Sequence, residues 1–174
     1  MSARCLAILE GPMAEASALL PDRMASNRAD ALLLAIGLQE SLLVARRQHN
    51  NGPARGLWQF ERGGSVRGVL THPATSAHAR RLCELRGVAP VAMDVWEALE
   101  HDDVLAAGFA LLNLWWLPQS LPELGDGARA FQQYLDAWRP GAYTRGDAAY
   151  KAKLRSKFLA YYAEAVDTVK GADA

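Results

Sequence analysis

The stretch that decides the fold is Ala-Leu-Leu-Leu-Ala-Ile-Gly-Leu at positions 31–38, followed by Gln39-Glu40-Ser41. Residues 31–38 are apolar around the whole circumference of a helix, which is the pattern of a helix buried in the middle of a domain. We predict that this helix begins at residue 27 or 28 and ends near residue 47. Gly37 costs such a helix about 1 kcal/mol relative to alanine, so we expect a close neighbour there.

The remainder of the chain also predicts helices, because no alternation of period two is long enough for a strand. We therefore expect a mainly α, single-domain fold over residues 1–174, with a central buried helix and little or no sheet. The motif-bearing core spans about 29–141, and a C-terminal helix spans about 147–169. Asp102 or Asp103 is a candidate N-cap. The other expected helices lie at about 13–20, 65–70, 77–86, 91–100, 102–116 and 128–138.

Composition excludes several classes of function. Nineteen basic residues balance nineteen acidic ones, so no net charge attracts nucleic acid or an anionic membrane. The apolar run near 104–117 is too short for a membrane span. Cys5 and Cys83 lack metal-ligand spacing, and no phosphate-binding glycine loop occurs, so we expect free thiols, no metal and no cofactor. Residues 1–20 do not resemble a secretory signal, which predicts synthesis in the cytoplasm without a signal peptide.

Glu40 is the candidate catalytic residue. On a helical wheel it shares an apolar stripe with Leu33, Ile36 and Leu43. Burial raises the pKa of a carboxyl group, and an acid that stays protonated near neutral pH can protonate a glycosidic oxygen. Alternatively, Glu40 faces water or pairs with one of the basic residues that follow it, namely Arg46, Arg47 or Arg55.

The loop after this helix carries a second candidate element, the turn Gly56-Leu57-Trp58-Gln59. Glycine allows the backbone to approach a ligand, tryptophan offers a flat face for a sugar ring, and glutamine offers both a donor and an acceptor. The alternative is that Trp58 and Phe60 belong to the core while Gln59 caps the turn locally.

Glu40-Ser41, followed about sixteen residues later by Gly-Leu-Trp-Gln, resembles the signature of the lysozyme-like superfamily of lytic transglycosylases and goose-type lysozymes. Residues 107–122 and 134–141 resemble a branch found in bacteriophage and prophage proteins. The resemblance covers roughly residues 29–141. It implies a lysozyme-like helical fold and cleavage of the β-1,4 bond between N-acetylmuramic acid and N-acetylglucosamine in peptidoglycan.

The resemblance also implies roles for single residues. Glu40 would act as general acid and then as base, Ser41 would support it or touch substrate, and Gly56, Leu57, Trp58 and Gln59 would line the cleft. The family's Ala-Tyr-Asn element is missing. The corresponding helix reads Phe-Gln-Gln-Tyr at 131–134, so Gln133 or Tyr134 is the candidate substitute.

A two-carboxylate hydrolase needs a partner about 6.5–9.5 Å away if inverting, or about 5–5.5 Å if retaining. Glu61 is the nearest candidate in the sequence, although a surface position is the alternative. Nothing in the sequence distinguishes hydrolysis from formation of a 1,6-anhydro product.

Three hypotheses about function follow. The first is a phage or prophage muramidase or lytic transglycosylase that acts at the bacterial cell wall, with peptidoglycan glycan strands as substrate, and that is carried as a virion component beside phage structural proteins. The second is an inactive phage structural or assembly protein that keeps the lysozyme-like scaffold. The third is a helical adaptor without glycan contact, which a buried Trp58 together with failure to bind chitooligosaccharides would favour.

Overall fold

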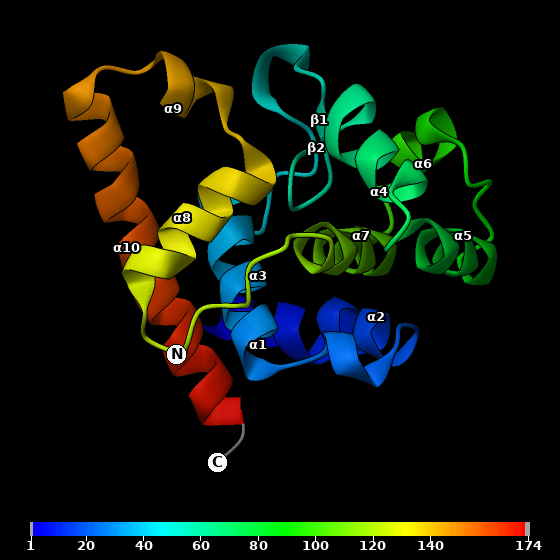
Figure 1. Ribbon diagram of the computed structural model, residues 1–174, viewed down its shortest axis with the longest axis horizontal. Coiled ribbons are helices and arrows are strands. Elements are labelled where there is room, and N and C mark those ends of the chain that lie inside the picture. The colour runs from blue at the N-terminus through cyan, green and yellow to red at the C-terminus, as the bar shows by residue number, and fades with distance from the viewer. Residues whose placement is uncertain (1, 173–174) are drawn as a thin grey trace.

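The computed structural model describes residues 2–172, with only the backbone of Asn51 described (Figure 1). The protein is a mainly α single domain that is 69% helical, and its only sheet in the described part is a two-stranded hairpin. The predicted fold class is therefore confirmed. None of the helices within residues 2–172 combines the length and apolar character that a bilayer span requires.

The N-terminal segment forms more helix than expected. It comprises α1 (Ala3–Ile8), η1 (Leu9–Met13), α2 (Ala14–Ala18) and η2 (Asp22–Met24), whereas the sequence predicted a single helix over 13–20. Gly11 takes a non-helical conformation before Pro12, inside the wide turn η1. Proline lacks the N–H that a regular helical turn needs, so a glycine followed by proline predicts a break in the helix. The sequence pattern therefore did not indicate that helical turns occur on both sides of this kink.

The central helix α3 (Asn27–Ser41) is buried as predicted, with ten of its 15 residues inside the core. Ser26 caps it by accepting a hydrogen bond from the Ala29 N–H. The helix ends at Ser41, six residues earlier than predicted. Leu42 and Leu43 turn into the left-handed region, with φ of 57° and 53°, and this turn returns the Leu43 side chain to the core at 4% exposure.

Gly37 explains why the chain can turn back so tightly. A Cβ at this position would overlap the Leu43 side chain and would lie 3.4 Å from the indole nitrogen of Trp58. The expected close neighbour is thus present, and it is the packing of Leu43 and Trp58 against the helix backbone.

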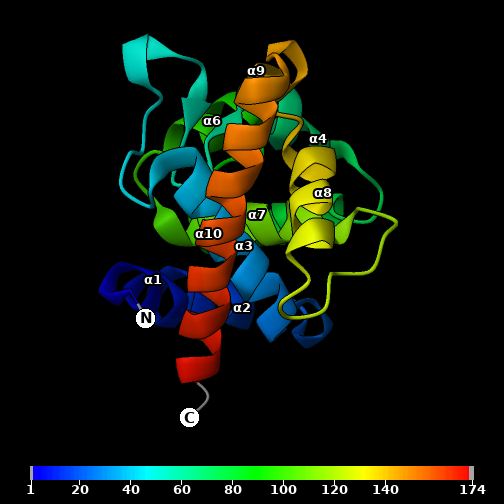
Figure 2. The ribbon, with the colours of Figure 1, turned by 90° about the vertical axis from the view of Figure 1, so that its left-hand side faces the viewer.

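The other helices surround α3. Figures 1 and 2 show α10 running along α3 with α8 beside it, while α7 lies on the other side with α4, α5 and α6. The bounds are η4 (Arg62–Val66), α4 (Arg67–Thr71), α5 (Ser76–Leu85), α6 (Ala92–Ala98), α7 (Asp103–Trp115), α8 (Gly127–Trp138), α9 (Gly141–Arg145) and α10 (Ala148–Ala172). Asp102 caps α7 by accepting from the Leu105 N–H at 2.9 Å, as predicted. The short helix α9 was not predicted.

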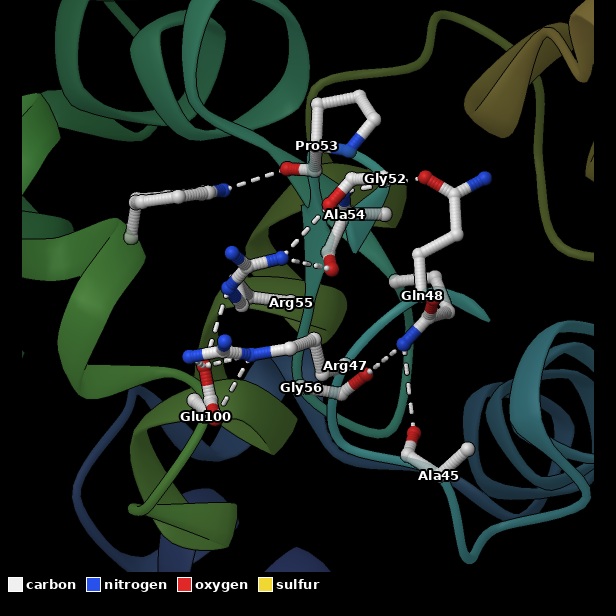
Figure 3. Close-up of polar contacts among 11 residues, drawn as sticks. Ala45, Arg47, Gln48, Gly52, Pro53, Ala54, Arg55, Gly56 and Glu100 are labelled. Carbon is white, nitrogen blue, oxygen red and sulfur yellow. Dashed lines mark hydrogen bonds and ion pairs between the residues drawn. The ribbon is translucent and has the colours of Figure 1, made fainter. Parts of the chain in front are cut away.

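The loop after α3 contains η3 (His49–Asn51) and a small antiparallel hairpin, β1 (Ala54–Arg55) and β2 (Phe60–Glu61). Two-residue strands are too short to leave an alternating pattern in the sequence. Figure 3 shows Arg47 and Arg55 converging on Glu100, at N–O distances of 3.0 Å each. These ion pairs hold the loop against the segment between α6 and α7.

Candidate active site

A cleft of about 1150 Å³ lies where the C-terminal end of α3 meets the hairpin loop and α8, α9 and α10. Its lining includes Gln39, Glu40 and Ser41 from α3, together with Gln59 and Glu61 from the hairpin. The opposite wall is built from the end of α8, from α9 and from α10. In Figure 1 these last elements stand to the left of the hairpin.

Glu40 lines this cleft from the last turn of α3. Burial raises the pKa of its carboxyl group to about 7, and a hydrogen bond from Tyr134 and the charge of Lys157 partly oppose that rise. The carboxyl group is therefore about half protonated near neutral pH, and it can both give and take a proton there.

The alternative of an arginine partner for Glu40 is not what the structure shows. Arg46 binds Asp103 through two hydrogen bonds, and Arg47 and Arg55 both bind Glu100. All three arginines therefore pair with acidic residues at the α6–α7 junction. None of them forms an ion pair with Glu40, so no arginine holds the Glu40 carboxyl group in its charged form.

Tyr134 comes from α8 and reaches Glu40 across 94 residues of sequence, its hydroxyl donating to Oε1 at 2.7 Å. The ring is 1% exposed and stacks on Phe158, with centroids 4.9 Å apart and planes 15° from parallel. Burial and the neighbouring carboxylate raise the pKa of the hydroxyl far above its usual value. Tyr134 therefore remains a proton-bearing donor whose position is fixed by packing.

Ser41 also lines the cleft, but its hydroxyl serves the backbone. It donates to the Leu57 carbonyl at 2.6 Å and accepts from the Leu43 N–H at 3.1 Å. The residue thus ties the end of α3 to the glycine turn. Its support for Glu40 is indirect, because it fixes the turn on which Glu40 stands.

The predicted cleft wall at Gly56, Leu57 and Trp58 requires correction. All three are buried, and the Trp58 ring is 0% exposed, with its indole N–H donating to the Leu33 carbonyl at 2.8 Å. Trp58 packs in the core instead of offering its face to a sugar. Gly56 has φ of +74°, and a Cβ there would lie 2.7 Å from the Leu99 carbonyl oxygen. A glycine is therefore needed at position 56 for the backbone to turn and to pack against Leu99.

Gln59 is the one residue of this turn that lines the cleft. Its side-chain amide donates to the Gly56 carbonyl at 2.9 Å and to the Ala45 carbonyl at 3.3 Å. The donor group is therefore used locally, as the capping alternative predicted, and the side-chain carbonyl oxygen is what Gln59 can offer a ligand.

Gln133 is buried on α8 at 5% exposure and is not part of the cleft lining, so the structure does not support direct contact with substrate. Glu61 lines the cleft and is exposed. Asp136, on the last turns of α8, lines it as well and was not predicted. The cleft therefore offers two candidates for a second carboxylate.

The cleft has a further wall at the ends of α7 and α4, where core packing was the preferred sequence interpretation for the tryptophan pair at 115–116 and a cleft wall was the alternative. Asn113 and Trp116 line the cleft three residues apart, together with His72. The Trp116 and His72 rings meet edge to face, with centroids 4.8 Å apart. Asn113 is fully buried, and its amide donates to the Ala137 carbonyl at 3.2 Å. A lone amide inside an apolar helix was a signal that could have identified this position.

Comparisons of the chain with family models, with characterised proteins and with solved structures find no match. Among residues 2–172, no group of three His, Cys, Asp or Glu side chains is arranged to hold a metal ion.

Proposed function

We propose that this protein cleaves peptidoglycan glycan strands at the β-1,4 bond between N-acetylmuramic acid and N-acetylglucosamine, with Glu40 as general acid. The observation that carries the proposal is a carboxyl group with a pKa of about 7 at the wall of a large cleft, held by a tyrosine hydroxyl. The Glu-Ser and Gly-Leu-Trp-Gln resemblance supplies the substrate class.

The reaction begins with Glu40 protonated. Because Tyr134 donates to Oε1, Oε2 is the oxygen free to carry the proton to the glycosidic oxygen. As the C1–O bond breaks, the proton passes to the leaving sugar and the electron pair of the bond stays on its oxygen. Positive charge then develops on the remaining ring, and the new carboxylate keeps the Tyr134 hydrogen bond.

The second half of the reaction returns the proton to Glu40. An attacking hydroxyl, from water or from the sugar's own C6, forms the new bond to C1 while Glu40 removes its proton. Water gives a reducing end and the C6 hydroxyl gives a 1,6-anhydro end. If the enzyme uses a second carboxylate, Glu61 and Asp136 are the candidates from the cleft lining.

The resemblance to phage and prophage proteins indicates where the activity would be used. We propose that the protein is made in the host cytoplasm and acts at the cell wall, as a virion component beside phage structural proteins. The second candidate is an inactive phage structural or assembly protein that keeps the scaffold, which the missing Tyr-Asn element favours. The third is a helical adaptor without glycan contact, which the burial of Trp58 favours.

The test is digestion of purified peptidoglycan, with mass spectrometry of the released muropeptides. We expect Glu40→Gln to lower the rate by about 10²- to 10⁴-fold, since that is what a positioned general acid contributes. Glu84→Gln is the matched control, because Glu84 lies on the surface in an ion pair with Arg81. Equal activity of Glu40→Gln would overturn the mechanism, and absence of product from the natural protein would favour the scaffold.

A further inference from the structure

One wall of the cleft is cationic. Arg139 follows α8, Arg145 ends α9 and Lys157 lies on α10, and all three line the cleft. They are exposed to solvent, and Lys157 is near enough to Glu40 for its charge to lower the pKa of that group. A ligand that reaches Glu40 therefore meets these charges as well.

The three cations differ from Arg47, which is the other arginine in the cleft lining. Arg47 and its loop neighbours Arg46 and Arg55 each bind an aspartate or glutamate. Within residues 2–172, neither arginine of the wall nor Lys157 makes an ion pair. The Arg139 Nε–H points to the Asp136 carbonyl oxygen at 3.4 Å, and Lys157 Nζ lies over the Tyr161 ring at 5.4 Å.

Acidic groups in the cleft do not cancel this charge. Glu40 is about half neutral near pH 7, and Glu61 belongs to the hairpin on the other side. Asp136 shares the cationic wall, where its carboxylate accepts a hydrogen bond from the Gln132 amide at 2.9 Å. This wall thus carries three positively charged side chains and one carboxylate.

Arg139 has a strained backbone conformation. Arg139 follows the last residue of α8 with φ of 47° and ψ of 54°, a left-handed conformation that glycine adopts most readily at helix ends. An arginine there carries strain that glycine would avoid, and such residues concentrate at ligand sites. The Pro140 that follows prevents the helix from continuing.

We propose that Arg139, Arg145 and Lys157 form a subsite for a carboxylate carried by the glycan, so that the cleft selects acidic glycan strands over neutral polymers of N-acetylglucosamine. This inference depends on the proposed function, since it assigns specificity to the same cleft. A guanidinium group matches a carboxylate with paired N–H donors. The carboxylate has two sources in peptidoglycan, namely the lactyl ether of the muramic acid and the peptide attached to it.

The experiment measures binding by calorimetry with the Glu40→Gln variant, which keeps the cleft without turnover. Four glycans of equal length are compared: chitotetraose, a peptide-free peptidoglycan tetrasaccharide with free lactyl carboxylates, the same tetrasaccharide with those groups converted to methylamides, and a peptide-bearing tetrasaccharide. We expect the peptide-free acid to bind at least about fivefold more tightly than its methylamide. This preference should weaken as salt is raised.

The same measurements on Arg139→Gln/Arg145→Gln should reduce the preference to less than about twofold, because glutamine removes the charge and keeps a polar side chain. Arg155→Gln on the exposed surface of α10, outside the cleft lining, should retain it. Thermal unfolding confirms that the variants are folded. A preference shown only by the peptide-bearing glycan assigns the carboxylate to the peptide.

Two outcomes separate this inference from the proposed function. If the acid, methylamide and peptide-bearing glycans all bind with equal affinity, the carboxylate subsite is wrong while glycan binding stands. If none of the four glycans binds, the proposed function fails and the inference fails with it. An undiminished preference in the double glutamine variant would also overturn the assignment to this wall.

Discussion

Glu40 and Trp58 come from two halves of one sequence motif, yet they end in opposite environments. Glu40 lines the cleft, while Trp58 is 0% exposed and donates its indole N–H into α3. A single motif can therefore combine a residue that is placed for catalysis with a residue that supports it from the core. Here the turn at 56–59 packs beneath the end of α3, and Ser41 joins the two through the Leu57 carbonyl.

The largest effect that tests this comparison is expected from Trp58. Replacing Trp58 by alanine should lower the free energy of unfolding by about 3–5 kcal/mol, because it leaves a cavity and removes the donor to Leu33. Chemical denaturation measures this loss. The milder Trp58→Phe variant should still bind glycan within about twofold, since the ring does not face the cleft.

Trp116 is the matched control, because it is a tryptophan that lines the cleft. Trp116→Ala should weaken glycan binding more than Trp58→Phe does, while it destabilises the fold less than Trp58→Ala. The comparison between core and cleft would be wrong if Trp58→Phe weakened binding more than Trp116→Ala did.

The next largest effect is the contribution of Glu40 to the pH dependence of the free energy of unfolding. Its folded-state pKa of about 7 lies above the ordinary value of 4.5, so the folded state binds more protons than the unfolded state between these limits. Stability therefore falls as pH rises from about 4.5 to 7. Glu40→Gln removes this dependence, and its advantage over the natural protein should grow by about 2 kcal/mol from pH 5 to pH 8.

Denaturation of both proteins at several pH values measures that difference, and groups common to both cancel. A constant difference across the range would show that Glu40 is not desolvated in the folded protein. Asp136→Asn, which removes a different carboxyl group from the lining of the same cleft, is measured alongside as the control.

The smallest effect is expected at Tyr134. Tyr134→Phe keeps the ring that stacks on Phe158 and removes the hydroxyl that donates to Glu40. Since that bond lowers the pKa of Glu40, its loss should move the alkaline limb of the pH–rate profile to higher pH. The maximal rate should fall by about tenfold, the effect of one lost hydrogen bond to the carboxylate. An alkaline limb displaced to lower pH would contradict this role.

Much of the fold could be predicted because it depends on local pattern. The apolar circumference of residues 31–38 predicted the buried helix, and Asp102 predicted the start of α7. The end of α3 could not be predicted, since Leu42 and Leu43 are residues that helices accept. Their left-handed turn is selected by packing of Leu43 on Gly37 and by the hydroxyl of Ser41.

The residues of the candidate site also fall into those that could be predicted from local sequence and those that could not. Glu40 could be identified because a carboxylate on an apolar stripe stands out in the sequence. Asp136, Arg139, Arg145 and Lys157 could not be connected with it, because charged residues on helices ordinarily face water. Their place in the cleft comes from the way α8, α9 and α10 pack against α3.

The sequence alone was enough to predict a mainly α domain built around one apolar helix, and to single out a lone carboxyl group, that of Glu40, on the apolar stripe of that helix. Three features became visible only in the folded protein: Trp58 lies in the core, Tyr134 donates a hydrogen bond to Glu40, and three basic side chains line the same cleft. They depend on contacts between residues that are far apart in the sequence. Hydrophobic periodicity records which side of a helix is buried, but contacts between residues 94 positions apart exist only after the helices have packed.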